Sequence, residues 1–300
     1  MSAITNLAEA NRRLGAFARI FQRSNPDELA EAFEELDLTQ VQLNLSALGL
    51  PTIPPQDERR RLDLGAIRRS FAVRGREIWG ISATYNTAHP EAKVRQTATQ
   101  QAARFIATLS ASGATAATLC SGSRDSRNMW GRHPETKTKA AWRDFRESLD
   151  LLIPAAEEAG VLLAVEPEPA NTVSDASSAL RLLDELGADG QQIGFILDPA
   201  NLISDVAPGD RDATLERAFD VLGERTICVH AKDTVPWARS LEGDGVVDYE
   251  LVAHLYAKLP HSVPLIIQDA SEAELAPIAD MLRKRLLAHT NHISEEQPKQ

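Results

Sequence analysis

Eight short apolar segments alternate with helical patterns between residues 14 and 288, and no linker interrupts the alternation. Each segment has the length and composition of a buried strand, and strands that alternate with helices form right-handed βαβ units around a parallel sheet. Eight such units in about 275 residues match a closed (β/α)₈ barrel, typically ~250 residues, better than an open doubly wound sheet. The predicted strands are residues 15–21, 40–45, 77–82, 114–119, 161–165, 193–197, 226–229 and 264–267.

We therefore predict an α/β fold with a single domain, a (β/α)₈ TIM barrel over residues 14–290. The dinucleotide-binding alternative lacks its fingerprint, because no Gly-x-Gly-x-x-Gly sequence follows the first predicted strand. The remaining residues are polar, and chain ends of this kind are commonly frayed. Residues 1–13 are predicted to be a flexible N-terminal segment and residues 291–300 a polar C-terminal tail.

The charge balance restricts the partners of the chain. Its 300 residues include 32 Lys and Arg against 43 Asp and Glu, a net charge of −11, which opposes binding to the phosphates of a nucleic acid. No apolar run approaches the roughly 20 residues of a membrane span. The N-terminus shows no export signal, and the two cysteines suit a reducing compartment. We expect a cytoplasmic protein with a small-molecule partner, without a nucleic-acid or membrane partner, whereas a homo-oligomer remains open.

Polar residues stand at the ends of four consecutive predicted strands, about one βα unit apart. They are Glu166, Asp198, His230 and Gln268. Because a (β/α)₈ barrel builds its active site at the carboxyl ends of its strands, these side chains should share one rim. Oxygen ligands with one imidazole suit a divalent ion such as Mn²⁺, Mg²⁺, Co²⁺ or Zn²⁺. The simpler alternative is that Glu166 or Asp198 only caps the helix that follows it.

Other polar residues near the same rim are candidates for substrate contacts. Ser121 and Arg124 belong to a Ser-Gly-Ser-Arg turn after the fourth strand, which could hold a phosphate or a sugar diol. An ordinary tight turn with a solvated arginine explains the same residues. His89 and His133 fall in the loops after the third and fourth strands, and Lys232 follows the seventh strand. Lys232 could polarise a substrate carbonyl or bind an anionic group, although a loop lysine needs no role.

A series of short motifs occurs in a fixed order over most of the chain. It includes Val41-Gln42-Leu43-Asn44-Leu45, Ser82-Ala83-Thr84-Tyr85-Asn86, Val165-Glu166-Pro167-Glu168, Leu197-Asp198-Pro199-Ala200-Asn201-Leu202 and Val229-His230-Ala231-Lys232-Asp233. In this ordered series the chain resembles the sugar phosphate isomerase/epimerase group of the xylose isomerase-like TIM barrels. Each motif alone is weak, whereas their order is specific for the family but not for a substrate.

The resemblance implies one divalent metal ion held by Glu166, Asp198 and His230, together with a carboxylate from the eighth strand. In this sequence that fourth position is Gln268, whose carbonyl oxygen can coordinate a cation but which cannot accept a proton. Many relatives place a histidine three residues after the aspartate of the sixth strand, where this chain has Asn201. Asn201 is therefore a candidate for substrate binding.

The predicted site suits proton abstraction next to a carbonyl through a metal-stabilised enediolate. Glu166 is the first candidate for the general base, Glu168 is the second, and Lys232 completes the candidate catalytic residues. We expect a sugar or sugar phosphate isomerase or epimerase, and the missing carboxylate at Gln268 favours isomerisation or lyase chemistry over epimerisation. The alternatives are a keto-sugar or keto-inositol dehydratase and a non-catalytic sugar-binding barrel. An apurinic endonuclease-like nuclease fits less well, because the protein is acidic and Asn201 replaces a histidine.

Overall fold

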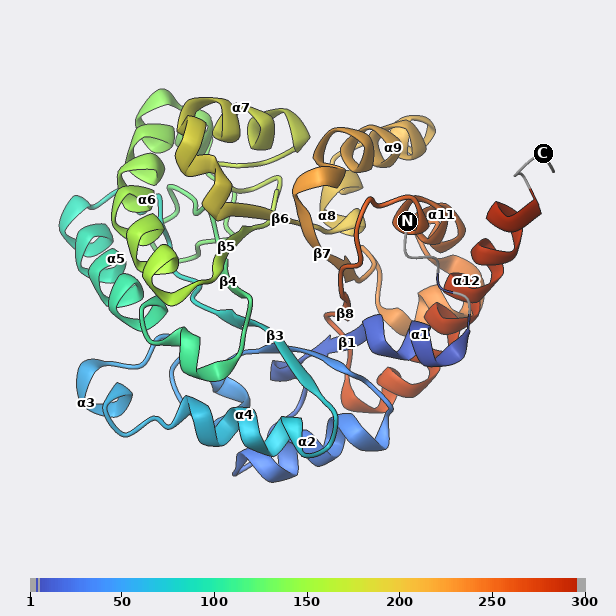
Figure 1. The fold of residues 1–300 in the computed structure, drawn as a ribbon. Coiled ribbons are helices and arrows are strands. Elements are labelled where there is room, and N and C mark those ends of the chain that lie inside the picture. The colour runs from blue at the N-terminus through green and yellow to red at the C-terminus, as the bar shows by residue number, and fades with distance from the viewer. Residues whose placement is uncertain (1–3, 5, 296–300) are drawn as a thin grey trace.

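Eight parallel strands close into a barrel in the computed structural model, which describes residue 4 and residues 6–295 (Figure 1). Neighbours in the chain are neighbours in the barrel, and the first strand pairs with the last. The (β/α)₈ fold predicted from the sequence is therefore confirmed. The strands are β1 (Leu14–Phe17), β2 (Gln40–Leu43), β3 (Glu77–Ser82), β4 (Ala116–Leu119), β5 (Leu162–Val165), β6 (Ile193–Leu197), β7 (Thr226–Ala231) and β8 (Leu265–Ile267).

Helices surround the barrel as an outer layer (Figure 1). Side-chain caps fix where several of them begin, since Asn25 accepts a hydrogen bond from the amide of Glu28 and Asp248 accepts from the amides at the start of its helix. None of the helices in the described part of the chain is long and apolar enough to cross a membrane. The α-helices are α1 (Leu7–Arg13), α2 (Pro26–Glu35), α3 (Gln56–Arg59), α4 (Leu64–Ala72), α5 (Ala92–Ile106), α6 (Lys139–Ala159), α7 (Ala176–Leu186), α8 (Pro199–Ile203), α9 (Arg211–Leu222), α10 (Trp237–Arg239), α11 (Tyr249–Ala257) and α12 (Leu275–Glu295).

Both chain ends contain more helix than the sequence predicts. Asn6 caps α1, and the buried Ala10 packs this helix into the core, so residues 7–13 are helical where a flexible segment was expected. The backbone of α12 continues to Glu295, into the predicted tail at residues 291–300. The prediction for residues 1–3, 5 and 296–300 lies outside the described residues. Burial of Ala10 explains the difference at the N-terminus, because packing against the core stabilises a helix. The polar composition of this segment does not indicate that packing.

Two apolar clusters form the core. The larger one lies between the sheet and the helices, and the smaller one joins residues from six strands, with Trp79, Ala116, Ile196, Cys228 and Ile266 among them. Successive side chains of a strand point to opposite faces, so the residues of one strand divide between the two clusters. Ile196, for example, belongs to the smaller cluster, whereas its neighbours on β6 belong to the larger one. The smaller cluster therefore fills the interior of the barrel.

Candidate metal centre and active site

The candidate functional side chains lie on the same inward face of their strands as the residues that fill the barrel. Ile196 and Cys228 fill the barrel interior, and two residues further along the same strands come Asp198 and His230. Ala164 on β5 is followed at the same spacing by Glu166. Because residues i and i+2 of a strand point to the same face, all three polar side chains enter the barrel at its carboxyl end.

Glu166, Asp198 and His230 form a tight cluster of possible metal ligands. The Nδ1 atom of His230 lies 3.3 Å from Oε2 of Glu166 and 3.8 Å from Oδ2 of Asp198. One ligand atom from each residue lies within 4.8 Å of the others. Two donors that each bind one ion at about 2.1 Å, with an angle of about 90–109° between them, lie about 3.0–3.4 Å apart. The spacing of the cluster is close to that of a divalent metal centre.

Two atoms of the cluster are buried without a hydrogen-bond partner among the described residues. They are Oδ2 of Asp198 and Nδ1 of His230, and both residues are fully buried. The other carboxylate oxygen of Asp198 accepts a hydrogen bond from the amide of Asn201 at 3.1 Å and caps α8. Asp198 is thus a helix cap through one oxygen only. Oδ2 of Asp198 has the ammonium group of Lys232 beside it at 3.1 Å. Nδ1 of His230 has the carboxylate of Glu166 at 3.3 Å, so within the described residues both atoms are in ionic contacts without a hydrogen bond. A divalent cation between them would give both atoms a ligand bond.

Two glutamines contact the remaining ring nitrogen of His230. Its Nε2 atom lies 2.9 Å from Oε1 of Gln42 and 3.0 Å from Nε2 of Gln268. A histidine that binds a metal through Nδ1 donates its Nε2–H to a second group, which fixes the ring. Gln42 is placed to accept this proton. Gln268 was predicted as a fourth metal ligand, but its amide lies beside Nε2 rather than beside Nδ1, which faces the carboxylates.

Lys232 and Asn201 contact the carboxylates of Asp198 and Glu166, respectively. The ammonium group of Lys232 lies 3.1 Å from Oδ2 of Asp198, and the side-chain amide of Asn201 donates a hydrogen bond of 2.6 Å to Oε1 of Glu166. Both residues were predicted to contact the substrate, and both line the same pocket as Glu166. The amide of Asn201 thus orients the carboxylate of Glu166.

The carboxyl groups of the site differ in pKa because their neighbours differ. Burial would raise the pKa of Glu166, but the nearby His230 and Lys232 outweigh it and lower the pKa to about 2. Burial raises the pKa of Asp198 to about 6, with Lys232 opposing the rise and Glu166 adding to it. Burial and then repulsion by Glu166 raise the pKa of Glu168 well above its usual range. The site therefore combines a strongly acidic carboxyl with two that hold their protons more tightly.

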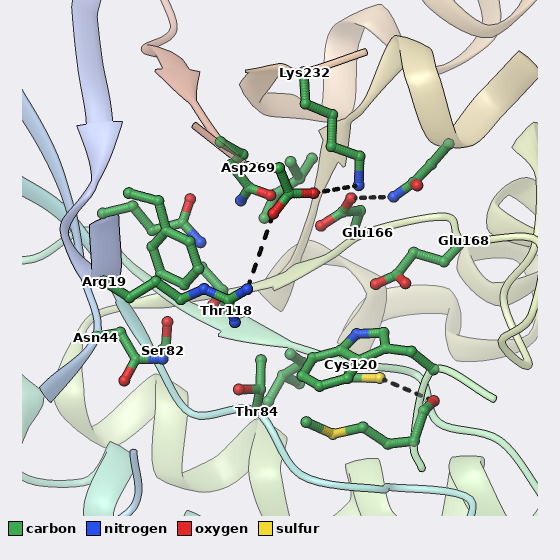
Figure 2. A pocket seen from close by; sticks show the side chains of 18 of the residues that line it. Arg19, Asn44, Ser82, Thr84, Thr118, Cys120, Glu166, Glu168, Lys232 and Asp269 are labelled. Carbon is green, nitrogen blue, oxygen red and sulfur yellow. Dashed lines mark hydrogen bonds and ion pairs between the residues drawn. The ribbon is translucent and has the colours of Figure 1, made fainter. Parts of the chain in front are cut away.

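A pocket of about 520 Å³ opens above this cluster, and its two halves differ in chemistry (Figure 2). One half carries charged side chains, among them Glu166, Glu168, Lys232 and Asp269. The other carries neutral polar side chains from β2, β3 and β4 and the loops that follow them, with Arg19 beside them. Asn44, Ser82 and Thr84 lie together on this second side (Figure 2). A pocket of this size encloses a small polar molecule.

Arg124 and Ser121, both predicted as substrate contacts, do not line this pocket. The guanidinium of Arg124 is buried and lies 2.8 Å from Oδ2 of Asp144 on α6. The hydroxyl of Ser121 accepts a hydrogen bond of 3.0 Å from the amide of Val173. The Ser-Gly-Ser-Arg turn is therefore part of the scaffold beneath the rim. Arg124 lies away from the pocket because its guanidinium pairs with a residue of the following helix.

His89 and His133 also lie outside the described lining of the pocket. The Nδ1 atom of His89 accepts a hydrogen bond from the amide of Glu91 at 3.1 Å, and that of His133 accepts from the amide of Glu135 at 3.3 Å. Each imidazole thus stabilises the turn that follows it, in the way that a helix cap does. The structure does not bring these two histidines to the metal cluster.

Replacing Asp144 with alanine should strongly destabilise the fold. Arg95 and Arg124 are buried and approach Oδ2 of Asp144 to 3.4 and 2.8 Å, so Asp144→Ala leaves two buried positive charges without this partner. Breaking a buried ion pair from one side typically costs about 3–5 kcal/mol, which urea denaturation measures. The control is Glu147→Ala, because Glu147 is exposed and approaches Arg95 only to 3.7 Å; its expected cost is about 0–1 kcal/mol. Equal stability losses in the two variants would contradict this account.

Comparison with known proteins identifies the family. The family model described as xylose isomerase-like TIM barrel matches residues 7–284, and a search of curated proteins finds no match. Among solved structures, an L-ribulose 3-epimerase superimposes with a TM-score of 0.75 at 16% identity, over 96% of this chain and 99% of that one. A 3-keto-D-glucoside 4-epimerase from E. coli gives 0.70 at 13% identity, over 91% and 98%. D-psicose 3-epimerase from Clostridium cellulolyticum H10 gives 0.61 at 13% identity, over 94% and 98%.

Proposed function

The chain belongs to the xylose isomerase-like TIM barrel family, and on that basis we propose that it is a divalent-metal-dependent sugar isomerase or epimerase. The observation that carries the proposal is the cluster of Glu166, Asp198 and His230, in which two buried atoms lack a hydrogen-bond partner among the described residues. The names of the structural neighbours, which are sugar epimerases, support the same class of reaction.

Glu166, Asp198 and His230 would hold the ion through Oε2, Oδ2 and Nδ1. When bound, a divalent cation supplies Lewis-acid stabilisation of the negative charge that develops on substrate oxygens. Gln268 lies beside Nε2 of His230 rather than beside the three ligand atoms, so we assign it no ligand position; Gln42 is placed to accept the Nε2–H of His230. The proposed centre therefore has three protein ligands and keeps positions open for substrate oxygens.

The proton transfer is assigned to the carboxylates at the pocket. Glu166 removes a proton from the carbon next to the substrate carbonyl, while Asn201 keeps its carboxylate oriented. Glu168 lines the same pocket and is the second candidate for moving a proton. Lys232 places its ammonium group beside Asp198, where it can hold negative charge on a substrate oxygen. Because Gln268 cannot accept a proton, transfer between neighbouring carbons by one base, an aldose–ketose isomerisation, is favoured over epimerisation.

The direct test is turnover of a panel of free and phosphorylated aldoses and ketoses by the full-length protein, first treated with EDTA and then loaded with Mn²⁺, Co²⁺, Mg²⁺ or Zn²⁺. Products are identified by NMR. The proposal predicts formation of an isomer or epimer that depends on added metal. A dehydrated product instead would support the keto-sugar dehydratase. Metal and sugar binding without any conversion would support a non-catalytic sugar-binding barrel.

Replacing Gln42 with leucine should weaken metal binding without removing a ligand. Gln42 is buried on β2 and is placed to accept the Nε2–H of His230 at 2.9 Å. Losing such a supporting group typically lowers metal affinity about 10- to 100-fold, which a competition titration with Mn²⁺ measures. The matched control is Gln40→Leu, because Gln40 lies on the same strand but bonds Arg12 and Glu77 instead. Identical affinities in the Gln42→Leu variant and the parent would show that the imidazole does not depend on Gln42.

A further inference from the structure

Two buried hydroxyl groups in the active-site pocket have no hydrogen-bond partner among the described residues. Ser82, at the end of β3, is fully buried, and Thr118 on β4 is 3% exposed. Both residues line the pocket above the metal cluster, and neither Oγ nor Oγ1 finds a partner. A buried hydroxyl without a hydrogen bond costs about 1–3 kcal/mol. Their position in the pocket indicates that the missing partner is a bound molecule.

The side of the pocket around these hydroxyls carries neutral polar side chains together with Arg19, which is paired with Asp269 (Figure 2). Asn44, Ser82 and Thr84 lie together there, across the pocket from Glu166, Glu168 and Lys232 (Figure 2). Hydroxyl and amide groups both donate and accept hydrogen bonds, as the hydroxyl groups of a sugar do. A phosphate offers only acceptors when it is fully ionised and is usually bound by cations or by free backbone amides.

Three amides of the turn that follows β4 donate to side chains of the protein, so they are not free to bind a phosphate. The amide of Gly122 donates to Oδ1 of Asn171 at 2.9 Å, and the amide of Arg124 donates to the hydroxyl of Thr136 at 2.9 Å. The amide between them, that of Ser123, donates to a side-chain oxygen as well. The amides of Gly122, Ser123 and Arg124 are therefore used within the protein.

The cations that line the pocket in the described part of the chain all have carboxylate partners. Lys232 lies 3.1 Å from Asp198 and 3.8 Å from Asp269, and Arg19 lies 3.9 Å from Asp269 on its other side (Figure 2). Arg132 makes two hydrogen bonds to the carboxylate of Asp205, at 2.7 and 2.6 Å. A phosphate would have to displace one of these ion pairs and leave its carboxylate near a second anion.

We infer that the substrate is an uncharged, unphosphorylated sugar whose hydroxyl groups remote from the reacting carbons bind Ser82 and Thr118. This inference rests on the proposed function, because it assumes that the carbonyl end of the sugar lies at the metal cluster. Ser82 and Thr118 lie on β3 and β4, whereas the metal cluster comes from β5, β6 and β7. A sugar that spans the pocket therefore satisfies both buried hydroxyls and places its carbonyl beside Glu166.

Calorimetric titration of the Mn²⁺-loaded, full-length protein tests the inference without relying on turnover. The probes are D-tagatose, D-fructose and L-ribulose, each compared with its own terminal phosphate ester. We expect at least one free sugar to bind, and its phosphate to bind about 10-fold more weakly or not at all. Tighter binding of a phosphate than of its free sugar would overturn the inference. So would the failure of all three free sugars to bind.

Removal of the hydroxyls identifies the residues involved. In Thr118→Val and Ser82→Ala, affinity for the bound sugar should fall about 3- to 10-fold, the loss expected for one neutral hydrogen bond. The matched control is Thr226→Val, since Thr226 is a buried strand threonine whose hydroxyl donates to the carbonyl of Leu222 at 2.9 Å. Without ligand, Thr118→Val should melt no lower than the parent, whereas Thr226→Val should melt lower. Parent-like affinity in both hydroxyl variants would contradict the assignment.

The same titrations separate this inference from the proposed function. If free sugars bind and Thr118→Val weakens them, but no sugar is converted, the inference stands and the isomerase proposal fails. If only phosphorylated sugars are bound and converted, the isomerase proposal stands and the inference fails.

Discussion

Asp198→Ala abolishes metal binding, and with it the activity, according to the proposed mechanism. Asp198 is fully buried, and its Oδ2 atom faces Nδ1 of His230 without a hydrogen-bond partner in the described part of the chain. Loss of a supporting group around a metal ligand costs about 10- to 100-fold in affinity, and loss of the ligand itself should exceed that range. The metal content of the purified protein, measured by elemental analysis, should fall from about one ion per chain to background.

Asp198→Asn separates this effect from damage to the fold. Asparagine keeps an oxygen that can cap α8, as Oδ1 of Asp198 does at 3.1 Å, but it removes the negative charge. We expect Asp198→Asn to fold normally and still to lose the ion. Asp205→Ala is the control for charge, because Asp205 is an exposed carboxylate that pairs with Arg132. Parent-like metal content in both Asp198 variants would remove Asp198 from the site.

Glu166→Gln should lower kcat about 100- to 10,000-fold at saturating metal, the range typical for loss of a general base. Glutamine has the size of glutamate and retains a carbonyl oxygen for coordination, but it cannot accept a proton. Steady-state kinetics are measured at Mn²⁺ concentrations that saturate each variant, so that weaker metal binding does not contribute to the loss.

Glu185→Gln is the matched control for this substitution. Glu185 bonds the indole of Trp142 at 2.6 Å and Arg181 at 2.7 Å, and it lies outside the described lining of the pocket. Its kcat should equal that of the parent. Loss of a general base typically lowers kcat at least about 100-fold. If Glu166→Gln retained more than about a tenth of the parent kcat, the loss would be smaller than that, and another group would have to move the proton. Glu168 would be the first to test.

The apolar segments of the sequence predicted the barrel because they report burial directly. Residues 77–82 and 193–197 form β3 and β6 with the predicted bounds. Strand β1 stops at Phe17, earlier than predicted, because residues 18–20 form a 3₁₀ turn. Strand β7 continues beyond its predicted end, through His230 to Ala231. The sequence does not reveal this because a buried polar residue within a strand looks like the start of a loop.

The cluster of Glu166, Asp198 and His230 could be predicted because these residues stand at the ends of strands of regular spacing, whereas the contact of Gln42 could not. Gln42 reaches His230 from a strand 188 residues earlier in the chain, and nothing local marks that contact. Thr118 does carry a signal, since it lies two residues after the interior residue Ala116 and should point into the barrel. The ion pair of Arg124 could not be predicted for a similar reason, because its partner Asp144 belongs to another element.

Deuterium uptake is the decisive test of the proposed reaction. That reaction is proton abstraction next to a carbonyl, dependent on a metal at Glu166, Asp198 and His230. The Mn²⁺-loaded protein is incubated in deuterated water with D-tagatose, D-fructose and L-ribulose, and each sugar is followed by NMR. We predict that deuterium enters a carbon next to the carbonyl, that EDTA reduces the rate to background, and that added Mn²⁺ restores it. Uptake that persists undiminished in EDTA, or no uptake into any sugar that binds the metal-loaded protein, would contradict the account.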